Sequence, residues 1–222
     1  MHRIAVIPAR GGSKRIPRKN IRSFCGRPMI AWSIAALCRS RLFDAVIVST
    51  DDDEIMEVAL SFGAEVPFRR PQYLADDHAP TLPVMQHALD WYETHCHAVD
   101  TLVCCYATAP FIQVSDIVES VNILEHLDAQ WDYVLPVAEY PYPIQRALRC
   151  KGASLHMCDA EMMTQRSQDL EPSYHDAGQF YTGKSSAWRQ QRPFFAGRSS
   201  AIILPRRRVV DIDTEEDWQF AE

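Results

Sequence analysis

The feature that most constrains the fold is an alternation of short, almost wholly apolar runs with segments of helical periodicity. The apolar runs occupy residues 4–7, 45–48, 101–105 and 133–137, with a less apolar one at 65–68. Helical spacing of apolar residues follows four of them, after Pro28, after Asp52, from Pro83 and from Val114. Strands that are apolar on both faces are buried on both faces, and helical crossovers cover them. The pattern therefore predicts an α/β fold: a Rossmann-like, largely parallel sheet covered by helices on both faces.

Such a sheet also predicts where a ligand binds. In open α/β sheets the ligand lies outside the carboxyl ends of the strands. The loop that starts at Ala9, Asp51 and the stretch from Tyr106 each follow an expected strand. We therefore expect these three loops to converge on one cleft.

The totals of the sequence exclude several classes of protein. The 222 residues allow one sizeable core and a small appendage. Seven cysteines without a C-x-x-C pair indicate neither a disulfide framework nor a zinc site. The net charge of −6 argues against a surface that coats nucleic acid. Because no apolar run approaches the ~20 residues of a membrane span, we expect a cytoplasmic protein with no nucleic-acid or membrane partner.

A basic loop follows the first strand and contains no acid between its first and last cation. Its cations are Arg10, Lys14, Arg15, Arg18, Lys19 and Arg22. Gly11 and Gly12 can adopt positive φ, which lets successive backbone N–H groups converge on an anion, and Ser13 adds a hydroxyl. The loop matches neither a Walker motif nor a dinucleotide fingerprint. A polyphosphate cradle and a solvated basic loop both fit these residues, and the cradle is favoured.

Two acids near the carboxyl end are candidate metal ligands. In an extended segment Asp211 and Asp213 point to the same side, while Ile212 points to the other. Magnesium commonly takes one or two protein carboxylates and completes its shell with water and phosphate. The alternative is that Asp213 or Thr214 caps the last helix, because Thr214-x-x-Asp217 resembles a capping box. Both interpretations can hold together, with Mg²⁺ as the expected cofactor.

The alternation of strands and helices fails between residues 139 and 176. Aromatic and methionine side chains lie here among polar residues, with weak periodicity. The segment could be an irregular lid, or an arm that packs on a second subunit, and the arm is favoured. The expected division is a nucleotide-binding domain of residues 1–138 and 177–222, with residues 139–176 inserted as a dimerisation arm.

The order of residues in the basic loop also resembles the signature of a known enzyme family. Ile-Pro-Ala-Arg-Gly-Gly-Ser-Lys-Arg-Ile-Pro-Arg-Lys-Asn, at residues 7–20, resembles the signature of the sialic acid cytidylyltransferases, which activate nonulosonic acids with CTP. Residues 70–77 resemble the family's Arg-Pro-x-x-Leu-Ala-x-Asp segment, and 210–213 match its Ile-Asp-Ile-Asp pattern. The resemblance implies a globular nucleotide domain with a small dimerisation element, and a homodimer. It also implies that Arg10, Lys14 and Lys19 act on the phosphates, with Lys19 at the α-phosphate. The implied CTP-binding residues are Arg10, Gly11, Gly12, Ser13, Lys14, Lys19, Asn20, Arg70 and Thr81, with Asn20 and Arg70 at the cytosine.

The remaining matches indicate a branch of that family. Lys-Arg-Ile-Pro at residues 14–17, and the stretches 142–146, 166–170 and 174–181, resemble the pseudaminic acid enzymes. Residues 174–178 depart from the Tyr-Arg-Pro-Asn-Gly of sialic acid enzymes, and residues 106–111 depart from their Gln-Pro-Thr-Ser-Pro-Leu. The implied sugar-binding residues are Tyr106, Gln145, Arg146, Arg166, Gln168, His175 and Gln179. A changed sugar pocket beside an unchanged phosphate loop is consistent with a changed sugar.

The expected reaction is therefore CTP plus pseudaminic acid, a nine-carbon keto sugar acid, giving the CMP-sugar and pyrophosphate. Its product would serve surface glycan or flagellin glycosylation. Sialic acid, legionaminic acid and Kdo stay open as alternative sugars. A nucleotide-sensing domain without turnover is the alternative outside enzymes. A His175-Asp176 hydrolase dyad is disfavoured, because the chain has no Gly-x-Ser-x-Gly elbow.

Overall fold

A computed structural model describes residues 1–76 and 79–222. The main strands are β1 (Arg3–Pro8), β4 (Ala45–Ser49), β5 (Thr101–Cys105), β6 (Tyr133–Glu139), β9 (Tyr174–Asp176), β10 (Phe180–Lys184) and β11 (Ser199–Ile203). Two hairpins add β2 (Ser23–Phe24) with β3 (Arg27–Pro28), and β7 (Leu148–Lys151) with β8 (Ser154–Met157). The helices are α1 (Met29–Ser40), α2 (Asp53–Ser61), α3 (Thr81–His95), α4 (Val114–His126), α5 (Ser185–Arg189) and α6 (Glu215–Ala221).

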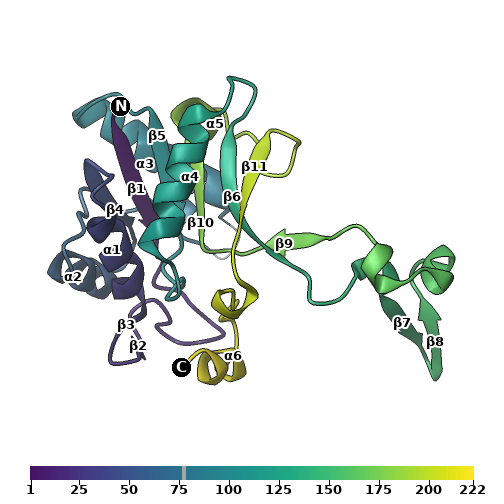
Figure 1. Cartoon of the computed structure of the whole chain (residues 1–222). Helices are drawn as coiled ribbons and strands as arrows, with labels where there is room; N and C mark the ends of the chain where they lie inside the picture. Colours follow the sequence, from purple (N-terminus) through teal and green to yellow (C-terminus); the bar gives the residue numbers. More distant parts are fainter. Residues whose placement is uncertain (77–78) are drawn as a thin grey trace.

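One mixed sheet organises the chain, in the order β11-β6-β10-β5-β1-β4, with β9 added beside β6 (Figure 1). Strands β4, β1, β5, β6 and β11 run in one direction. Strand β10 runs antiparallel to both of its neighbours, β5 and β6. The prediction of a largely parallel sheet is therefore confirmed, with β10 reversed at its centre and the short β9 also antiparallel to its neighbour β6. This reversal brings the start of β10 to the edge where β1, β4, β5 and β6 end.

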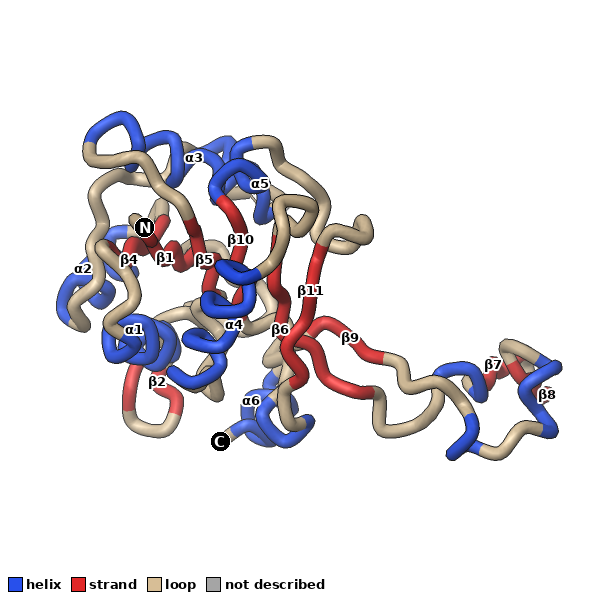
Figure 2. Tube along the Cα trace, turned by 45° about the horizontal axis from the view of Figure 1, so that its top comes forward, coloured by secondary structure: helices blue, strands red, loops and turns tan. Residues whose placement is uncertain are grey.

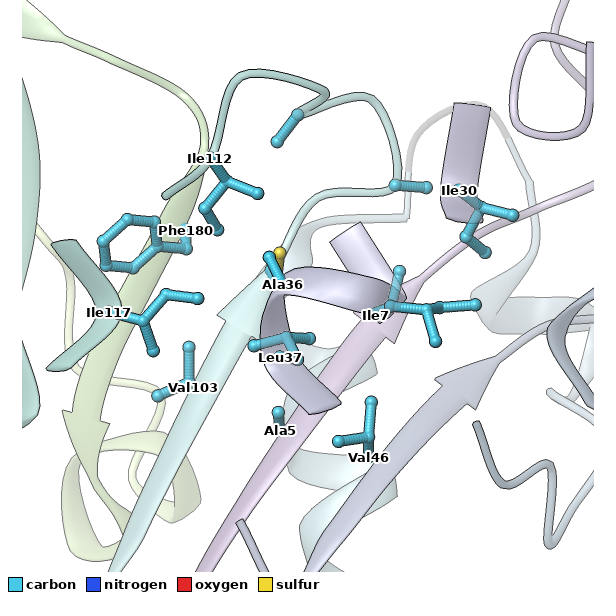
Figure 3. Close-up of a cluster of buried hydrophobic side chains, with 14 of the residues drawn as sticks. Ala5, Ile7, Ile30, Ala36, Leu37, Val46, Val103, Ile112, Ile117 and Phe180 are labelled. Atoms are coloured by element: carbon cyan, nitrogen blue, oxygen red, sulfur yellow. The ribbon is translucent and has the colours of Figure 1, made fainter. Parts of the chain in front are cut away.

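Helices cover both faces of the sheet, as expected. Side chains of α1, α2 and α4 pack on one face against Ile7, Val48 and Val103 (Figure 3). Side chains of α3 and α5 pack on the other face against Ile4 and Leu102. The alternating side chains of each strand thus contribute to two separate cores, which explains why the strands are apolar throughout.

A third, smaller core joins the two ends of the chain. Ile16 of the basic loop and Phe24 of β2 pack with Ile212 and Trp218, and all four are nearly inaccessible to solvent. The view in Figure 2 shows α6 beside the β2–β3 hairpin. Helix α6 begins at the predicted capping box, in which Thr214 and Asp217 bond each other's backbone and side chain. This core places Asp211 and Asp213 opposite the basic loop.

The segment between β6 and β10 projects from the sheet. Figures 1 and 2 both show β7 and β8 well away from the main body, connected to it by the ends of β6 and β9. Its register pairs Leu148 with Met157 and Cys150 with Leu155. Residues two apart on a strand share a face, so these four side chains form one apolar face of the hairpin. Leu148 and Leu155 are 55% and 62% exposed.

Two local predictions were wrong. Residues 65–68 form no strand but only isolated bridges, Ile47 with Glu65 and Thr50 with Arg69. Pro67 lies between them and has no N–H to donate to a ladder. Helix α3 begins at Thr81 rather than at Pro83.

No helix in the described ranges is both long and apolar enough to cross a bilayer.

Asp132, just before β6, is a buried charge whose loss should destabilise the fold. Its carboxylate accepts hydrogen bonds from Arg192 and Arg198, and its side chain is 2% exposed. Burial alone would raise the pKa of Asp132, but the two guanidinium groups outweigh burial and lower it. We expect Asp132→Asn to lower the free energy of unfolding by about 2–3 kcal/mol at pH 7.

The pH dependence of this effect has a definite sign. A lowered carboxyl pKa stabilises the folded protein above the unfolded pKa of about 4, and this contribution is lost as the pH falls through the folded pKa. The difference in melting temperature between wild type and Asp132→Asn should therefore be largest near neutral pH and shrink below about pH 4. Asp128→Asn, an exposed change four residues earlier, is the control. Equal effects of the two substitutions would contradict this account.

Candidate active site

A cavity of about 460 Å³ opens at the carboxyl edge of the sheet. The basic loop and the residues after β5 converge there, as predicted, and the start of α3 joins them. Asp51, the third position predicted for this cleft, does not line the cavity but accepts a hydrogen bond from the Gly11 N–H. Among its lining residues are Arg10, Ser13, Lys14, Arg15, Lys19, Asn20, Arg70, Thr81, Tyr106 and Thr108. Of the nine residues predicted to bind CTP, all but Gly11 and Gly12 line this cavity. We call it the nucleotide cavity.

A second cavity, of about 510 Å³, adjoins the first. It lies between the segment leading into β10 and the chain ahead of α6. Among its lining residues are Lys19, Tyr106, Thr108, His175, Asp176, Gly178, Tyr181, Asp211 and Asp213. Lys19, Tyr106 and Thr108 line both cavities. We call the second one the acidic cavity, and these three residues form the junction.

The backbone conformation predicted for the two glycines of the basic loop was wrong. Neither Gly11 nor Gly12 has positive φ, whereas Arg18 does, at 56°. Gly11 is needed for close approach, because a Cβ there would lie 2.5 Å from a carboxylate oxygen of Asp52. The Gly11 N–H donates to Asp51, and the Arg18 guanidinium binds Asp52 and Glu54. Acids at the start of α2 thus hold the loop in place, and part of its positive charge is structural.

Lys19 connects the amino-terminal loop to the carboxyl-terminal acids. Its Nζ lies 2.6 Å from the Ile212 carbonyl oxygen and 3.2 Å from Asp213 Oδ1. Arg15 also pairs with Asp213, at 2.6 Å. Two regions almost 200 residues apart in sequence therefore meet at the junction of the cavities.

Arg70 is a buried cation at the wall of the nucleotide cavity. It is 5% exposed, and its guanidinium donates to the hydroxyl and carbonyl oxygens of Ser49 at the end of β4. Burial lowers the pKa of Arg70 to about 10, which leaves it charged at neutral pH. Arg69, in contrast, points to solvent and pairs with Asp53. Arg70 therefore faces the cavity, whereas Arg69 lies on the surface. Asp77, the end of the motif that contains Arg70, lies outside the described residues.

The two candidate metal ligands face the same cavity. Asp211 and Asp213 both line the acidic cavity, while Ile212 between them is buried in the third core. Burial and the nearby charge of Asp213 raise the pKa of Asp211. A bound cation would relieve that repulsion. No cluster of three or more metal-binding side chains occurs within residues 1–76 and 79–222. Two carboxylates beside a cluster of cations fit Mg²⁺, which needs few protein ligands.

The predicted sugar-binding residues fall into two groups. Tyr106 and His175 line the acidic cavity. Gln179 is buried just before β10 and lines neither of the two described cavities; its Nε2 donates to the Arg208 carbonyl oxygen. Its Oε1 is buried without a hydrogen-bond partner among the described residues. The other four belong to the projecting segment and line neither cavity in the described part of the chain; they are Gln145, Arg146, Arg166 and Gln168.

Sequence reasoning missed three polar residues of the acidic cavity. Thr108 lies at the junction, and Asp176 and Tyr181 line the wall formed by β9 and β10. The Tyr181 hydroxyl donates to Asp176, and the Gly178 N–H donates to the same carboxylate at 3.0 Å. The sequence carried no local signal for them, because only the reversal of β10 in the folded sheet brings residues 176–181 to the ligand edge.

A nucleotide-type cavity at the carboxyl edge of an α/β sheet, joined to an acidic cavity with two metal-competent carboxylates, defines a nucleotidyltransferase. The model of the cytidylyltransferase family matches residues 4–185. The chain belongs to this family and is a CTP-dependent nucleotidyltransferase. The family resemblance and the enzyme class predicted from the sequence are therefore confirmed.

Curated relatives cover the whole chain. It is 42% identical to the pseudaminic acid cytidylyltransferase of Campylobacter jejuni, over all of this chain and 95% of that protein. It is 30% identical to the CMP-N,N'-diacetyllegionaminic acid synthase of Legionella pneumophila, over 100% and 95% of the two chains. It is 29% identical to the N-acylneuraminate cytidylyltransferase of Escherichia coli, over 98% of this chain and 51% of that protein.

Solved structures agree on the fold. A CMP:2-keto-3-deoxy-manno-octonic acid synthetase complexed with CTP aligns over 100% of this chain and 97% of its own, with a TM-score of 0.71 and 16% identity. A 4-diphosphocytidyl-2C-methyl-D-erythritol synthase from Anaerococcus prevotii aligns with a TM-score of 0.65 and 12% identity, over 99% and 96% of the two chains.

Proposed function

We propose that the protein transfers CMP from CTP to pseudaminic acid and releases pyrophosphate. The observation that supports this most is the junction, because one cavity lined by cations and one lined by acids meet at Lys19. The 42% identical relative carries this activity in its name. The alternative sugars are sialic acid, legionaminic acid and Kdo.

In this proposal the nucleotide cavity holds CTP. Arg10 and Lys14 neutralise the phosphates, assisted by the Ser13 hydroxyl and by backbone N–H groups of the loop. Arg70, a buried donor, faces the cytosine, whose ring offers carbonyl and ring-nitrogen acceptors. Asn20 lines the same cavity, and its Nδ2 donates to the Arg10 carbonyl oxygen at 2.9 Å. This hydrogen bond joins the beginning and the end of the basic loop.

The reaction itself takes place at the junction. The anomeric hydroxyl of the sugar attacks the α-phosphorus in line, a new P–O bond forms, and the bond to the pyrophosphate oxygen breaks. The hydroxyl proton is released, and pyrophosphate leaves with the electron pair. The protein contributes mainly position and charge. Lys19 lies where both substrates meet, so its ammonium group stabilises charge that develops on the α-phosphate.

Asp211 and Asp213 would hold Mg²⁺ beside that ammonium group. When bound, the ion would neutralise phosphate charge and lower the pKa of an oxygen that it contacts. Ile212, which lies between the two acids, is buried, and its burial holds the side chains of Asp211 and Asp213 on the side that lines the cavity. The proposal assigns the proton of the sugar hydroxyl to no protein base.

A direct assay tests the proposal. The purified protein is incubated with CTP, Mg²⁺ and each of pseudaminic, sialic, legionaminic acid and Kdo, and pyrophosphate release is measured. We expect the highest kcat/KM with pseudaminic acid. A higher value with another acid reassigns the sugar. Tight CTP binding without pyrophosphate release for any acid supports a nucleotide-sensing domain instead.

We further propose that the protein is a homodimer held by the projecting segment. An isolated two-stranded hairpin is only marginally stable in water, yet β7–β8 exposes Leu148 and Leu155 on one face. A second copy of the chain would bury that face. Arg146 and Arg166 lie on the same segment, away from the cavities of their own subunit, so the proposal assigns them to the acidic cavity of the partner.

The dimer proposal makes two predictions. A variant altered in the hairpin should have the mass of a monomer, and two inactive variants should restore activity when they are mixed. Leu148→Asp combined with Leu155→Asp should give a monomer by sedimentation equilibrium, with far-ultraviolet circular dichroism almost unchanged. Mixing Lys19→Met with Arg166→Ala, each inactive alone, should restore turnover after subunit exchange, because one mixed site contains neither change. An Arg39→Ala protein, altered on the exposed surface of α1, is the dimer control. A wild-type monomer would reject the proposal.

A further inference from the structure

The basic loop is bound to the start of α2 at two points. The Gly11 N–H donates to Asp51 Oδ1 at 3.1 Å, and the Arg18 guanidinium donates to both carboxylate oxygens of Asp52, at 2.5 and 2.9 Å. Asp52 is itself held in place, because its side chain caps the first turn of α2. Residues 12–17 lie between the two points and include three residues that line the nucleotide cavity. The loop is therefore closed across two consecutive acids.

Arg18 has a backbone conformation that residues other than glycine rarely adopt. Its φ is 56°, in the left-handed region. Its carbonyl oxygen accepts the N–H groups of Ile21 and Arg22 at 3.0 and 2.9 Å, so it lies within a tight turn. Lys19 and Asn20 come directly after it and line the nucleotide cavity. Because a change of φ at Arg18 would rotate the chain that follows, its conformation determines where these two side chains point.

The Arg18 side chain is directed to α2 and not to a cavity. It lines neither cavity within the described part of the chain, and its guanidinium also donates to Glu54 at 2.5 Å. The side chains of Arg18 and Asp52 are 37% and 21% exposed, whereas those of Arg69 and Asp53, paired at the same helix end, are 59% and 74% exposed. Hydrogen bonding to Arg18 lowers the pKa of Asp52, so the pair stays ionised at neutral pH. A bidentate and partly shielded pair has a defined geometry, unlike most surface pairs.

We propose that Arg18 is a positioning residue for CTP. Its ion pair with Asp52 offsets the strain of the left-handed turn, and the turn directs Lys19 and Asn20 into the nucleotide cavity. Strained backbone of this kind persists where neighbouring contacts hold it. The same ion pair fixes the end of residues 11–18, which carry a hydroxyl and an ammonium group to the cavity. The inference rests on the proposed function for the place of CTP and is independent of the identity of the sugar.

Two substitutions of Arg18 separate the ion pair from the backbone. Glycine adopts positive φ without strain and alanine does not, but both lack the guanidinium. Arg18→Ala and Arg18→Gly should each raise the Kd for CTP, measured by calorimetry without sugar or Mg²⁺, about tenfold. Both should also lower kcat, because Lys19 turns away from the junction, and should leave the KM for the sugar unchanged. Arg18→Lys should restore part of the affinity. If Arg18→Gly binds CTP as tightly as wild type, the ion pair is not needed and the proposal is overturned.

Asp52→Asn distinguishes positioning from simple attraction. Asparagine is also a good N-cap, so the helix end is preserved. If Arg18 acted on CTP only through its positive charge, removal of the nearby negative charge of Asp52 would tighten CTP binding. The proposal predicts the opposite, a Kd for CTP raised about threefold or more. Arg18→Ala combined with Asp52→Asn should bind CTP no more weakly than Arg18→Ala alone, since both changes remove one interaction. Fully additive losses, or tighter binding by Asp52→Asn, overturn the proposal.

Arg69→Ala is the matched control. It removes an arginine paired with another acid of the same helix end, Asp53, and Arg69 lines neither cavity in the described ranges. The Kd for CTP should stay within about twofold of wild type, as expected for a surface position. Circular dichroism checks that each variant is folded. If Arg18→Ala does not fold, Arg18→Gly and Asp52→Asn give the same comparison.

Lys14→Met tests the place of CTP separately, because Lys14 lines the nucleotide cavity. Weaker CTP binding by Lys14→Met, together with wild-type affinity in the Arg18 variants, overturns the role of Arg18 alone. Unchanged affinity in Lys14→Met removes the proposed place of CTP and, with it, the role of Arg18. A wild-type protein that binds CTP but does not activate pseudaminic acid changes only the sugar, and the binding comparison still decides the role of Arg18.

Discussion

Lys19→Met lowers kcat about 10²- to 10³-fold and changes the affinity for CTP much less, on our proposal that the ammonium group acts on charge that develops during transfer. Methionine keeps most of the apolar stem, so packing around the side chain is retained. Asp213 keeps Arg15 as an ion-pair partner, which limits the loss of stability. The measurements are steady-state pyrophosphate release and equilibrium CTP binding.

Lys184→Met is the matched control for this experiment. Lys184 also donates from Nζ to a backbone carbonyl, that of Asp128 at 2.9 Å, but it lies at the far end of β10. Its replacement should leave kcat within about twofold of wild type, as expected for a surface position. A Lys19→Met enzyme that loses CTP affinity and keeps its kcat would show that Lys19 serves ground-state binding only.

Asp211→Asn should abolish magnesium-dependent turnover, with a loss of about 10³-fold or more, because a neutral amide oxygen replaces one of two carboxylate ligands. CTP binding in the absence of Mg²⁺ should be unchanged or tighter, since a negative charge beside the phosphates is removed. The burial of a charge and the repulsion from Asp213, which together raise the pKa of Asp211, also disappear, so the melting temperature without metal should not fall. Titration of Mg²⁺ in the assay measures the first effect, and calorimetry measures the others.

Glu216→Gln provides the comparison. This acid lies on the exposed side of the first turn of α6, a few residues away, and lines neither cavity in the described ranges. Its removal should leave the magnesium dependence unaltered. If Asp211→Asn retains wild-type turnover at saturating Mg²⁺, the metal site lies elsewhere and the pairing of Asp211 with Asp213 has another role.

The parallel part of the fold could be predicted because its signal is local. Strands at residues 4–7 and 45–48 are apolar on both faces, and a strand with two buried faces needs helices on both. The reversal of β10 could not be predicted, because direction within a sheet depends on long-range pairing that residues 180–184 do not encode. The bridges at residues 65–69 were mistaken for a strand because β-propensity outweighed the missing donor of Pro67.

In the candidate site, too, the residues with a local sequence signal could be predicted, and those that depend on long-range contacts could not. The residue order of the basic loop is recognisable, so Lys14, Lys19 and Asn20 could be predicted to line the nucleotide cavity before any coordinates. Its anchors could not, because Arg18 reaches Asp52 across 34 positions and positive φ at Arg18 has no signature in the sequence. Asp176 was overlooked since its role depends on a tyrosine five residues later whose orientation only the folded strand determines.

The place where the projecting segment joins the sheet has an evolutionary consequence. Strand β6 leaves the sheet at the ligand edge, and β10 re-enters at that edge, so the chain between them begins and ends beside the acidic cavity. Insertions, deletions or replacement of the projecting segment would therefore leave the register of the remaining strands unchanged. Recombination at these two points would replace the whole projecting segment and leave the residues of the nucleotide cavity in place.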